Sequence, residues 1–190
     1  MSIRRRAITA ATLLVTTALV GACSRTGGPA SDVPSAAPAT AHADAHDDRF
    51  ELVLESTKVR WSAGEPIDLR ATLRYIGAGS GVDYAASGGG PIAFSLREIG
   101  GTRVVEYVRT ADCRPYTIAT DEPLVVPYQK SGGFSPGEPN EAFLRAFLAD
   151  PVLSLPAGSW EVTADMELYV PTCERDTDVR LSAALTLIVE

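Results

Sequence analysis

The sequence predicts an all-β domain: an antiparallel sandwich of the immunoglobulin type, with about seven strands and one short helix inserted between the fifth and sixth strands. Two observations predict this fold. From Arg49 onward, apolar residues alternate with polar ones, which is the period of a strand with one buried face. Turn-forming Gly and Pro residues separate these runs. A length of 190 residues with 45% hydrophobic residues is typical of one globular domain.

The strands follow from the alternation. Phe50, Leu52 and Leu54 alternate with Glu51 and Glu55, and a similar pattern recurs around Trp160 near the end of the chain. Each such run places one face on a core and the other in water. In chain order, strands are expected at residues 50–55, 67–76, 91–98, 102–109, 123–129, 160–170 and 181–189.

One segment has helical rather than strand spacing. Apolar residues stand at 143, 144, 147 and 148, with Asn140 as the expected N-cap and Asp150-Pro151 as the stop. This short amphipathic helix is expected to pack over the open end of the sandwich. Any part of its apolar face left exposed would be a partner site.

The first residues predict export. Arg4, Arg5 and Arg6 precede an uncharged stretch that is too short for a permanent membrane span. The run Leu19-Val20-Gly21-Ala22-Cys23 resembles the lipobox of bacterial lipoproteins. This resemblance implies a signal peptide at 1–22 and a mature chain that begins with Cys23, carrying lipid such as palmitate. The protein would then be anchored to the cell membrane and face the extracytoplasmic side. An ordinary secretory signal is the alternative, and the general secretory and twin-arginine routes both stay open.

Residues 23–48 read as a flexible tether, and residues 49–190 as the folded domain. The tether is rich in Ala, Pro, Ser, Gly and Asp, which cannot bury enough surface to fix one structure. It also holds the possible metal ligands His42, Asp44, His46, Asp47 and Asp48. We expect no metal there, because a site needs donors on rigid backbone.

Cys113 and Cys173 predict a disulfide. With Cys23 lipidated they leave an even number of cysteines in an oxidising compartment. If successive strands run antiparallel, both cysteines follow strands of the same direction and lie at one end, with the loops 77–90 and 171–180. The same reasoning places the tether at that end. Two redox-active thiols are the alternative, but no C-x-x-C spacing supports them.

Charge and composition exclude several functions. The formal net charge is −7, and removing the three Arg of residues 1–22 leaves 14 basic against 24 acidic residues, a charge of −10. Such a chain repels nucleic acid. The predicted domain has no histidine and no P-loop, so we expect no catalytic residues, no cofactor and no metal. The acid pair Asp165 and Glu167 would serve a hydrolase only if a cleft desolvated one of them.

The segment Lys130, Ser131, Gly132, Gly133 and Phe134 is the predicted binding site. A glycine-rich run flanked by a cation and an aromatic residue, next to the predicted helix, offers a surface for a ligand or a protein partner. A flexible turn is the other interpretation, since the spacing is not that of a phosphate-binding loop.

This segment, together with Asn140, Phe143, Phe147 and the run from Leu155 to Trp160, resembles a group of uncharacterised bacterial lipoproteins with immunoglobulin-like domains. The runs around 64–67, 75–77 and 91–94 are similar to the same group. The resemblance implies an exported sandwich with Trp160 as a core anchor, and it implies no activity. We therefore expect a lipid-anchored envelope protein that binds an unknown protein or ligand without catalysis. The alternatives are a structural accessory subunit of an envelope complex and a carboxylate-dependent hydrolase.

Overall fold

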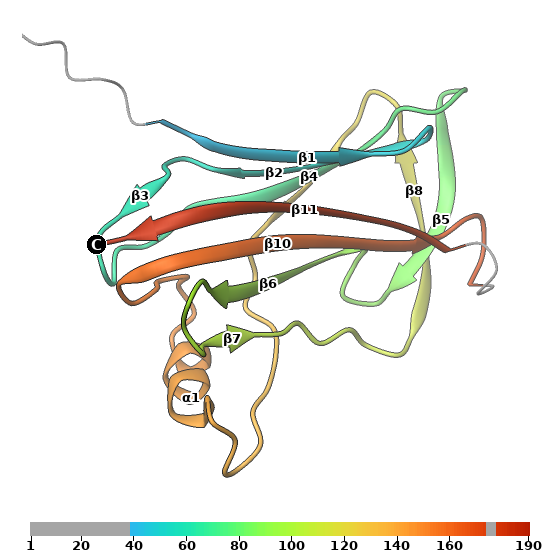
Figure 1. The fold of residues 1–190 in the computed structure, drawn as a ribbon. Helices are drawn as coiled ribbons and strands as arrows, with labels where there is room; N and C mark the ends of the chain where they lie inside the picture. The colour runs from blue at the N-terminus through green and yellow to red at the C-terminus, as the bar shows by residue number, and fades with distance from the viewer. Residues whose placement is uncertain (1–38, 174–177) are drawn as a thin grey trace, which may run out of the picture. The chain divides into compact units, whose positions relative to one another are not determined.

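The computed structural model describes residues 39–173 and 178–190 (Figure 1). These residues form an all-β fold with two sheets and one short helix, as the alternation predicts. The elements, in order, are β1 (Ala41–His46), β2 (Phe50–Ser56), β3 (Arg60–Trp61), β4 (Leu69–Tyr75), β5 (Gly81–Ser87), β6 (Ile92–Glu98), β7 (Val104–Val105), β8 (Cys113–Ala119), β9 (Leu124–Pro127), α1 (Glu141–Ala149), β10 (Gly158–Tyr169) and β11 (Asp178–Val189).

The two sheets differ in regularity. The first is fully antiparallel, in the order β1-β2-β4-β9. The second is built on the long hairpin of β10 and β11 (Figure 1). Strand β6 pairs along the other edge of β10 and carries β7. Strand β5 pairs with β10 only at Ala85 opposite Tyr169, and β8 pairs with β5. The β5–β8 strand pair is therefore weakly attached to its sheet by backbone pairing.

The inward faces of the two sheets form one hydrophobic core. Phe50, Leu52 and Leu54 of β2 are fully buried, as are Trp160 and Val162 of β10. These are the positions that the alternation places inside. Burial of large apolar side chains at roughly 25 cal/mol per Å² is the main stabilising contribution here.

Residues 41–46 are a strand rather than part of a tether, so the domain begins before Arg49. Strand β1 pairs with β2 from Ala41 opposite Ser56 to His46 opposite Glu51. Its alanines face inward, with Ala41 buried, and its histidines and Asp44 face outward. Small alanines in a proline-free run can lie on a core edge without any large apolar residue. Nothing in the sequence indicates this strand, because its composition, without large apolar residues, resembles that of a tether.

The chain consequently enters the domain at the end opposite the cysteines. The Val59 amide donates a hydrogen bond to the Ala39 carbonyl, next to the 62–66 turn. The prediction that the chain enters beside the cysteines was wrong because β1 adds one antiparallel strand before β2. Residues 1–38, which include Cys23, lie outside the described residues.

The Cys113–Cys173 disulfide is confirmed, with 6.1 Å between the two Cα atoms. It joins the start of β8 to the segment after β10. Strands β5 and β8 themselves occupy regions expected as loops. Their residues lack a clean alternation: in β8 only Ile118 is buried, and β5 buries Tyr84 together with two alanines. The strand expected at 102–109 is shortened to the two residues of β7.

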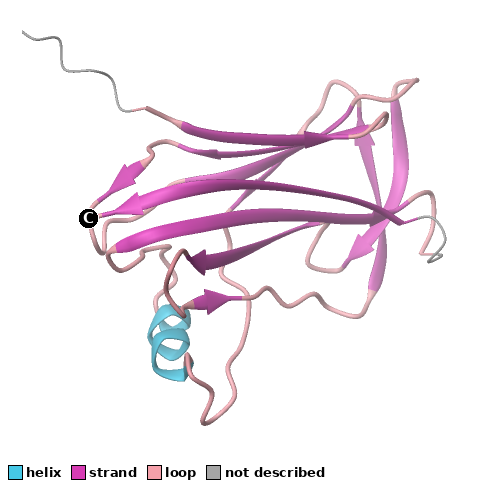
Figure 2. Cartoon of the chain, viewed as in Figure 1, coloured by secondary structure: helices cyan, strands magenta, loops and turns pink. Residues whose placement is uncertain are grey.

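Helix α1 forms where it is predicted (Figure 2), and its N-terminal end lies against Thr102, next to β7, and Trp160 of β10. Leu144 and Phe147 are buried, and Phe143 stacks on Trp160 with 5.8 Å between ring centroids. Asn140 occupies the N-cap position, but its side chain donates to the Thr102 carbonyl instead of capping the helix.

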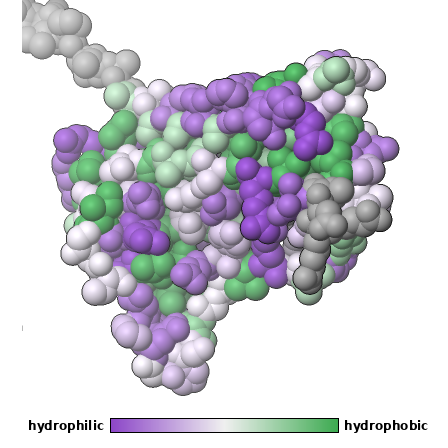
Figure 3. Space-filling view, turned by 45° about the vertical axis from the view of Figure 1, so that its right-hand side comes forward, coloured by the Kyte–Doolittle hydropathy of each residue, from purple (hydrophilic) through white to green (hydrophobic). Residues whose placement is uncertain are grey.

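The surface is mixed on the face shown in Figure 3, where hydrophobic residues form small patches among hydrophilic ones. Across residues 39–173 and 178–190, no helix has both the length and the apolar character that a membrane span requires.

Candidate functional site

Lys130, the first residue of the predicted binding segment, contacts helix α1. Its ammonium donates a 2.6 Å hydrogen bond to the backbone carbonyl of Phe147. The same ammonium lies 4.0 Å from the centroid of the Phe147 ring. The last turn of α1 contains no basic residue, so this cation complements the negative end of the helix dipole. Burial lowers the pKa of Lys130, and the nearby Asp150 carboxylate opposes that shift. Lys130 thus fastens its segment to the helix.

The rest of the segment also lies along α1. Gly132 has φ +131°, and a Cβ there would lie 2.7 Å from the Glu106 carbonyl oxygen, so glycine is required. The guanidinium of Arg145 lies 4.6 Å from the centroid of the Phe134 ring. Ser131 is half-buried and Gly133 is exposed. The structure brings the five predicted residues together, with Lys130, Gly132 and Phe134 engaged in packing.

A groove of about 360 Å³ opens beside this contact. It is lined by Gly64, Lys130, Phe143, Ala146, Phe147, Asp150, Ser154, Leu155 and Pro156. Its lining is largely apolar, with one ammonium and one carboxylate. The groove could accept an apolar segment of a partner, and Lys130 is the one predicted binding residue that reaches it.

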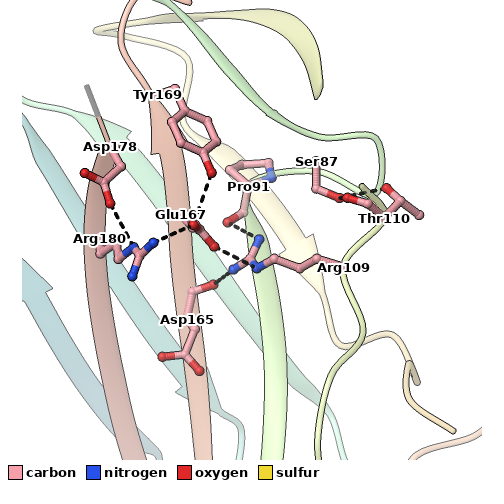
Figure 4. Close-up of polar contacts among 9 residues, drawn as sticks. All are labelled: Ser87, Pro91, Arg109, Thr110, Asp165, Glu167, Tyr169, Asp178 and Arg180. Atoms are coloured by element: carbon pink, nitrogen blue, oxygen red, sulfur yellow. Dashed lines mark hydrogen bonds and ion pairs between the residues drawn. The ribbon is translucent and has the colours of Figure 1, made fainter. Parts of the chain in front are cut away.

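The acid pair Asp165 and Glu167 does not converge on a cleft (Figure 4). The Glu167 carboxylate lies 3.5 Å from Arg109 Nε and accepts hydrogen bonds from Arg180 and from the Tyr169 hydroxyl. The Asp165 carboxylate points away from this cluster, and only its backbone carbonyl accepts a hydrogen bond from Arg109. Glu167 therefore acts as an anchor for neighbouring strands rather than as one of two cooperating acids.

A hollow of about 370 Å³ lies on the outward face of β6, β7 and β10; we call it the polar pocket. It is lined by Ser95, Leu96, Arg97, Val104, Glu106, Tyr107, Glu161 and Thr163. Ser95 and Thr163 are direct cross-strand partners and are half-buried, so their hydroxyls lie on its floor. The exposed side chains of Arg97, Glu106 and Glu161 form the rim.

Apart from Tyr107, whose ring contacts Arg109, the polar side chains of this pocket have no side-chain partner among the described residues. In the described part of the chain, Arg97, Glu106 and Glu161 form no ion pair, and the hydroxyls of Ser95 and Thr163 form no side-chain hydrogen bond. Elsewhere such charges do pair: Glu51 and Glu55 on β2 bind Arg74 and Arg70, their direct partners on β4, at 2.8 and 3.3 Å.

Arg97 and Glu161 are direct partners in the same way on β6 and β10, yet their charges stay apart. Concave sites with convergent polar groups that have unused hydrogen-bonding capacity are typical of small-ligand sites.

The sequence predicts that most of these residues lie on strands, but it does not predict that they line one pocket. The alternation around Trp160 already puts Glu161 and Thr163 on the outward face. The missing information was the early end of β7, after which residues 106 and 107 leave the strand and border the hollow. Without the register of β6 against β10, nothing in the sequence shows that Ser95 faces Thr163.

The described residues contain no group of three or more His, Cys, Asp or Glu side chains arranged to hold a metal ion. His42 comes nearest, since its ring nitrogens lie 3.6 Å from Asp44 and 3.9 Å from Glu55. His42 and Asp44 are exposed and Glu55 is half-buried on the first sheet, and these contacts are those of a surface ion pair.

Comparison with family models and with curated proteins gives no relative from which a function could be carried over. No family model matches the chain, and no curated protein matches it.

Proposed function

We propose that the chain is an exported protein, lipid-anchored at Cys23, whose all-β domain binds a component of the cell envelope without catalysis. The lipobox-like run that ends at Cys23 supports anchoring. The Cys113–Cys173 disulfide supports residence in an oxidising compartment. Cys23→Ser should release the protein from the membrane fraction, and mass spectrometry of the mature N-terminal peptide should find lipid on Cys23 in the wild type.

The domain belongs, in this proposal, to the immunoglobulin-like sandwiches. Two largely antiparallel sheets around one core and the fully buried Trp160 support that assignment. Such sandwiches commonly serve as rigid frames that present loops and sheet faces to partners.

The polar pocket is the observation that carries the binding function. Its hydroxyls, carboxylates and guanidinium converge on one hollow, and in the described residues they form no hydrogen bonds with one another. A ligand that met these groups would use hydrogen-bonding capacity that no described residue occupies. Because the pocket lies on paired strands, its floor is held rigidly, which lowers the entropic cost of binding.

The groove beside α1 favours a second candidate, an accessory subunit of an envelope complex. An apolar lining between Lys130 and Asp150 suits a protein segment better than a small polar ligand. The hydrolase alternative has less support, because Glu167 is already bound by Arg109 and Arg180.

Co-sedimentation with insoluble envelope material tests the binding function. Ser95→Arg fills the floor of the polar pocket, and Ser182→Arg places the same side chain on the outward face of β11, outside the pocket. We expect the wild type and Ser182→Arg to co-sediment and Ser95→Arg to stay in the supernatant. Equal co-sedimentation of all three proteins would overturn the assignment of binding to this pocket, and loss with α1 groove variants would favour the accessory subunit.

A further inference from the structure

We propose that the polar pocket recognises a neutral saccharide chain. This inference rests on the proposed binding function and names its ligand class. A sugar ring presents hydroxyl groups that donate and accept hydrogen bonds, and two C–H faces that pack on aromatic rings. The pocket offers a partner for each of these features.

The floor matches the hydroxyl groups. Ser95 and Thr163 lie opposite each other on β6 and β10, and each hydroxyl can donate one hydrogen bond and accept two. The carboxylates of Glu106 and Glu161 add acceptors at the rim, and the Arg97 guanidinium adds donors. Since the described residues give these groups no other partners, all of this capacity is open to a polyol.

Tyr107 supplies an aromatic surface that is held in place. The guanidinium of Arg109 lies 5.0 Å from the centroid of the Tyr107 ring. Arg109 is itself fixed, because it donates hydrogen bonds to the carbonyls of Pro91 and Asp165 at 3.2 and 2.7 Å (Figure 4). Through this contact the half-buried ring is ordered before a ligand arrives, which reduces the entropy lost on binding.

The charge and the volume of the polar pocket further restrict the class of ligand that it can bind. Two carboxylates and one guanidinium give the pocket one net negative charge, on a chain whose formal charge is −7. Phosphate and carboxylate ligands are therefore repelled. The positive charge of Arg97 weakens the attraction between the pocket and a simple amine. An amine without hydroxyl groups would also leave the hydroxyls of Ser95 and Thr163 without hydrogen-bond partners. A volume of about 370 Å³ lies in the range of roughly 300–1,000 Å³ usual for small-ligand sites.

Titration calorimetry on the purified full chain tests the ligand class. The neutral probes are maltotetraose, cellotetraose, mannotetraose and chitotetraose; tetragalacturonate and spermidine are the charged probes. We expect at least one neutral tetrasaccharide to bind with a Kd of about 1 mM or tighter, a strength usual for a small polar ligand. Ser95→Arg and Tyr107→Leu should each weaken that binding at least tenfold, and Ser182→Arg should leave it unchanged. Unchanged circular-dichroism melts would confirm that the variants fold.

The outcomes separate this inference from the proposed function. If none of the neutral probes binds, or only tetragalacturonate or spermidine does, the saccharide class is overturned. The binding function survives that result when Ser95→Arg still abolishes co-sedimentation with the envelope. If Ser95→Arg changes neither measurement, both proposals fail.

Discussion

Arg97 lies directly across from Glu161 on the outward face of the second sheet, and in the described residues the two charges do not pair. The equivalent neighbours Arg74 and Glu51 on the first sheet lie 2.8 Å apart at their charged atoms. Both side chains line the rim of the polar pocket, beside the floor formed by Ser95 and Thr163. Because the two charges stay apart, the pocket is accessible. The ion pair that they do not form would have added little to the stability of the fold, because surface ion pairs contribute little.

Glutamates 98 and 161 should respond differently to the same substitution. Glu98 is largely buried and accepts a 2.8 Å hydrogen bond from Arg103, which is the first cause of its lowered pKa. Glu98→Gln should cost about 1 kcal/mol of unfolding free energy, whereas Glu161→Gln should cost almost nothing. Urea unfolding at neutral pH measures both. A larger loss at position 161 would show that its carboxylate has a structural partner.

Reduction of the Cys113–Cys173 disulfide should lower the melting temperature. The bond closes a loop of 60 residues, which in the chain-entropy model stabilises the fold by about 4 kcal/mol. In the described residues β5 pairs with β10 at the single position Ala85–Tyr169 and β8 pairs with β5, so amide exchange should rise first in β5 and β8. Cys113→Ser and the double serine variant should melt alike, with or without reductant. A melt of the wild type that reductant leaves unchanged would contradict this role.

Lys130→Met should destabilise helix α1. The substitution keeps the length of the side chain but removes the hydrogen bond to the Phe147 carbonyl and the charge at the helix end. We expect a loss of about 1–2 kcal/mol in denaturant unfolding. Lys130→Arg retains a charged donor and should recover part of that loss. If Lys130→Met unfolds like the wild type but loses envelope binding, Lys130 is a ligand contact and not a capping residue.

Alkaline pH should destabilise the fold through Tyr84. Burial raises the pKa of Tyr84 to about 12, with the neighbouring Tyr116 as a second cause. In the unfolded chain this pKa is about 10, so the folded state holds the proton longer. The resulting stabilisation is present below pH 10 and is lost as pH rises through 12. Tyr128, whose pKa burial also raises, adds to the loss in the same direction.

Melts at pH 8 and pH 11 measure this effect. At pH 11 Tyr84 should account for about 1 kcal/mol of lost stability. Tyr84→Phe should reduce the loss by that amount, and Tyr107→Phe, which removes a half-buried phenol from the polar pocket, serves as the control. Equal alkaline losses in the wild type and Tyr84→Phe would show that the Tyr84 phenol does not couple to folding.

The regular part of the fold could be predicted because each of its strands buries every second large side chain. The run from Trp160 to Leu168 in β10 shows that period without interruption, and the helical spacing of Phe143, Leu144 and Phe147 is equally clear. Strands β1 and β8 escaped prediction for the opposite reason. The inward residues of β1 are alanines, and β8 buries only Ile118, so neither strand shows an apolar period.

The candidate site was harder to predict because it depends on register. The segment from Lys130 to Phe134 looked distinctive in sequence, but much of that character serves packing against α1. Ser95 and Thr163 look ordinary, and only the pairing of β6 with β10 makes them neighbours. The types of two residues that lie far apart in the chain do not indicate that the strands pair them.

Amide chemical-shift mapping would test the central claim most directly. The labelled full chain would be titrated with the soluble polysaccharide fraction of the envelope from the cells that make it. We predict that the shifts concentrate at Ser95, Tyr107 and Thr163, while Phe143 and Leu155 in the groove beside α1 stay unchanged. Shifts confined to that groove, or no shifts at all, would contradict binding at the polar pocket.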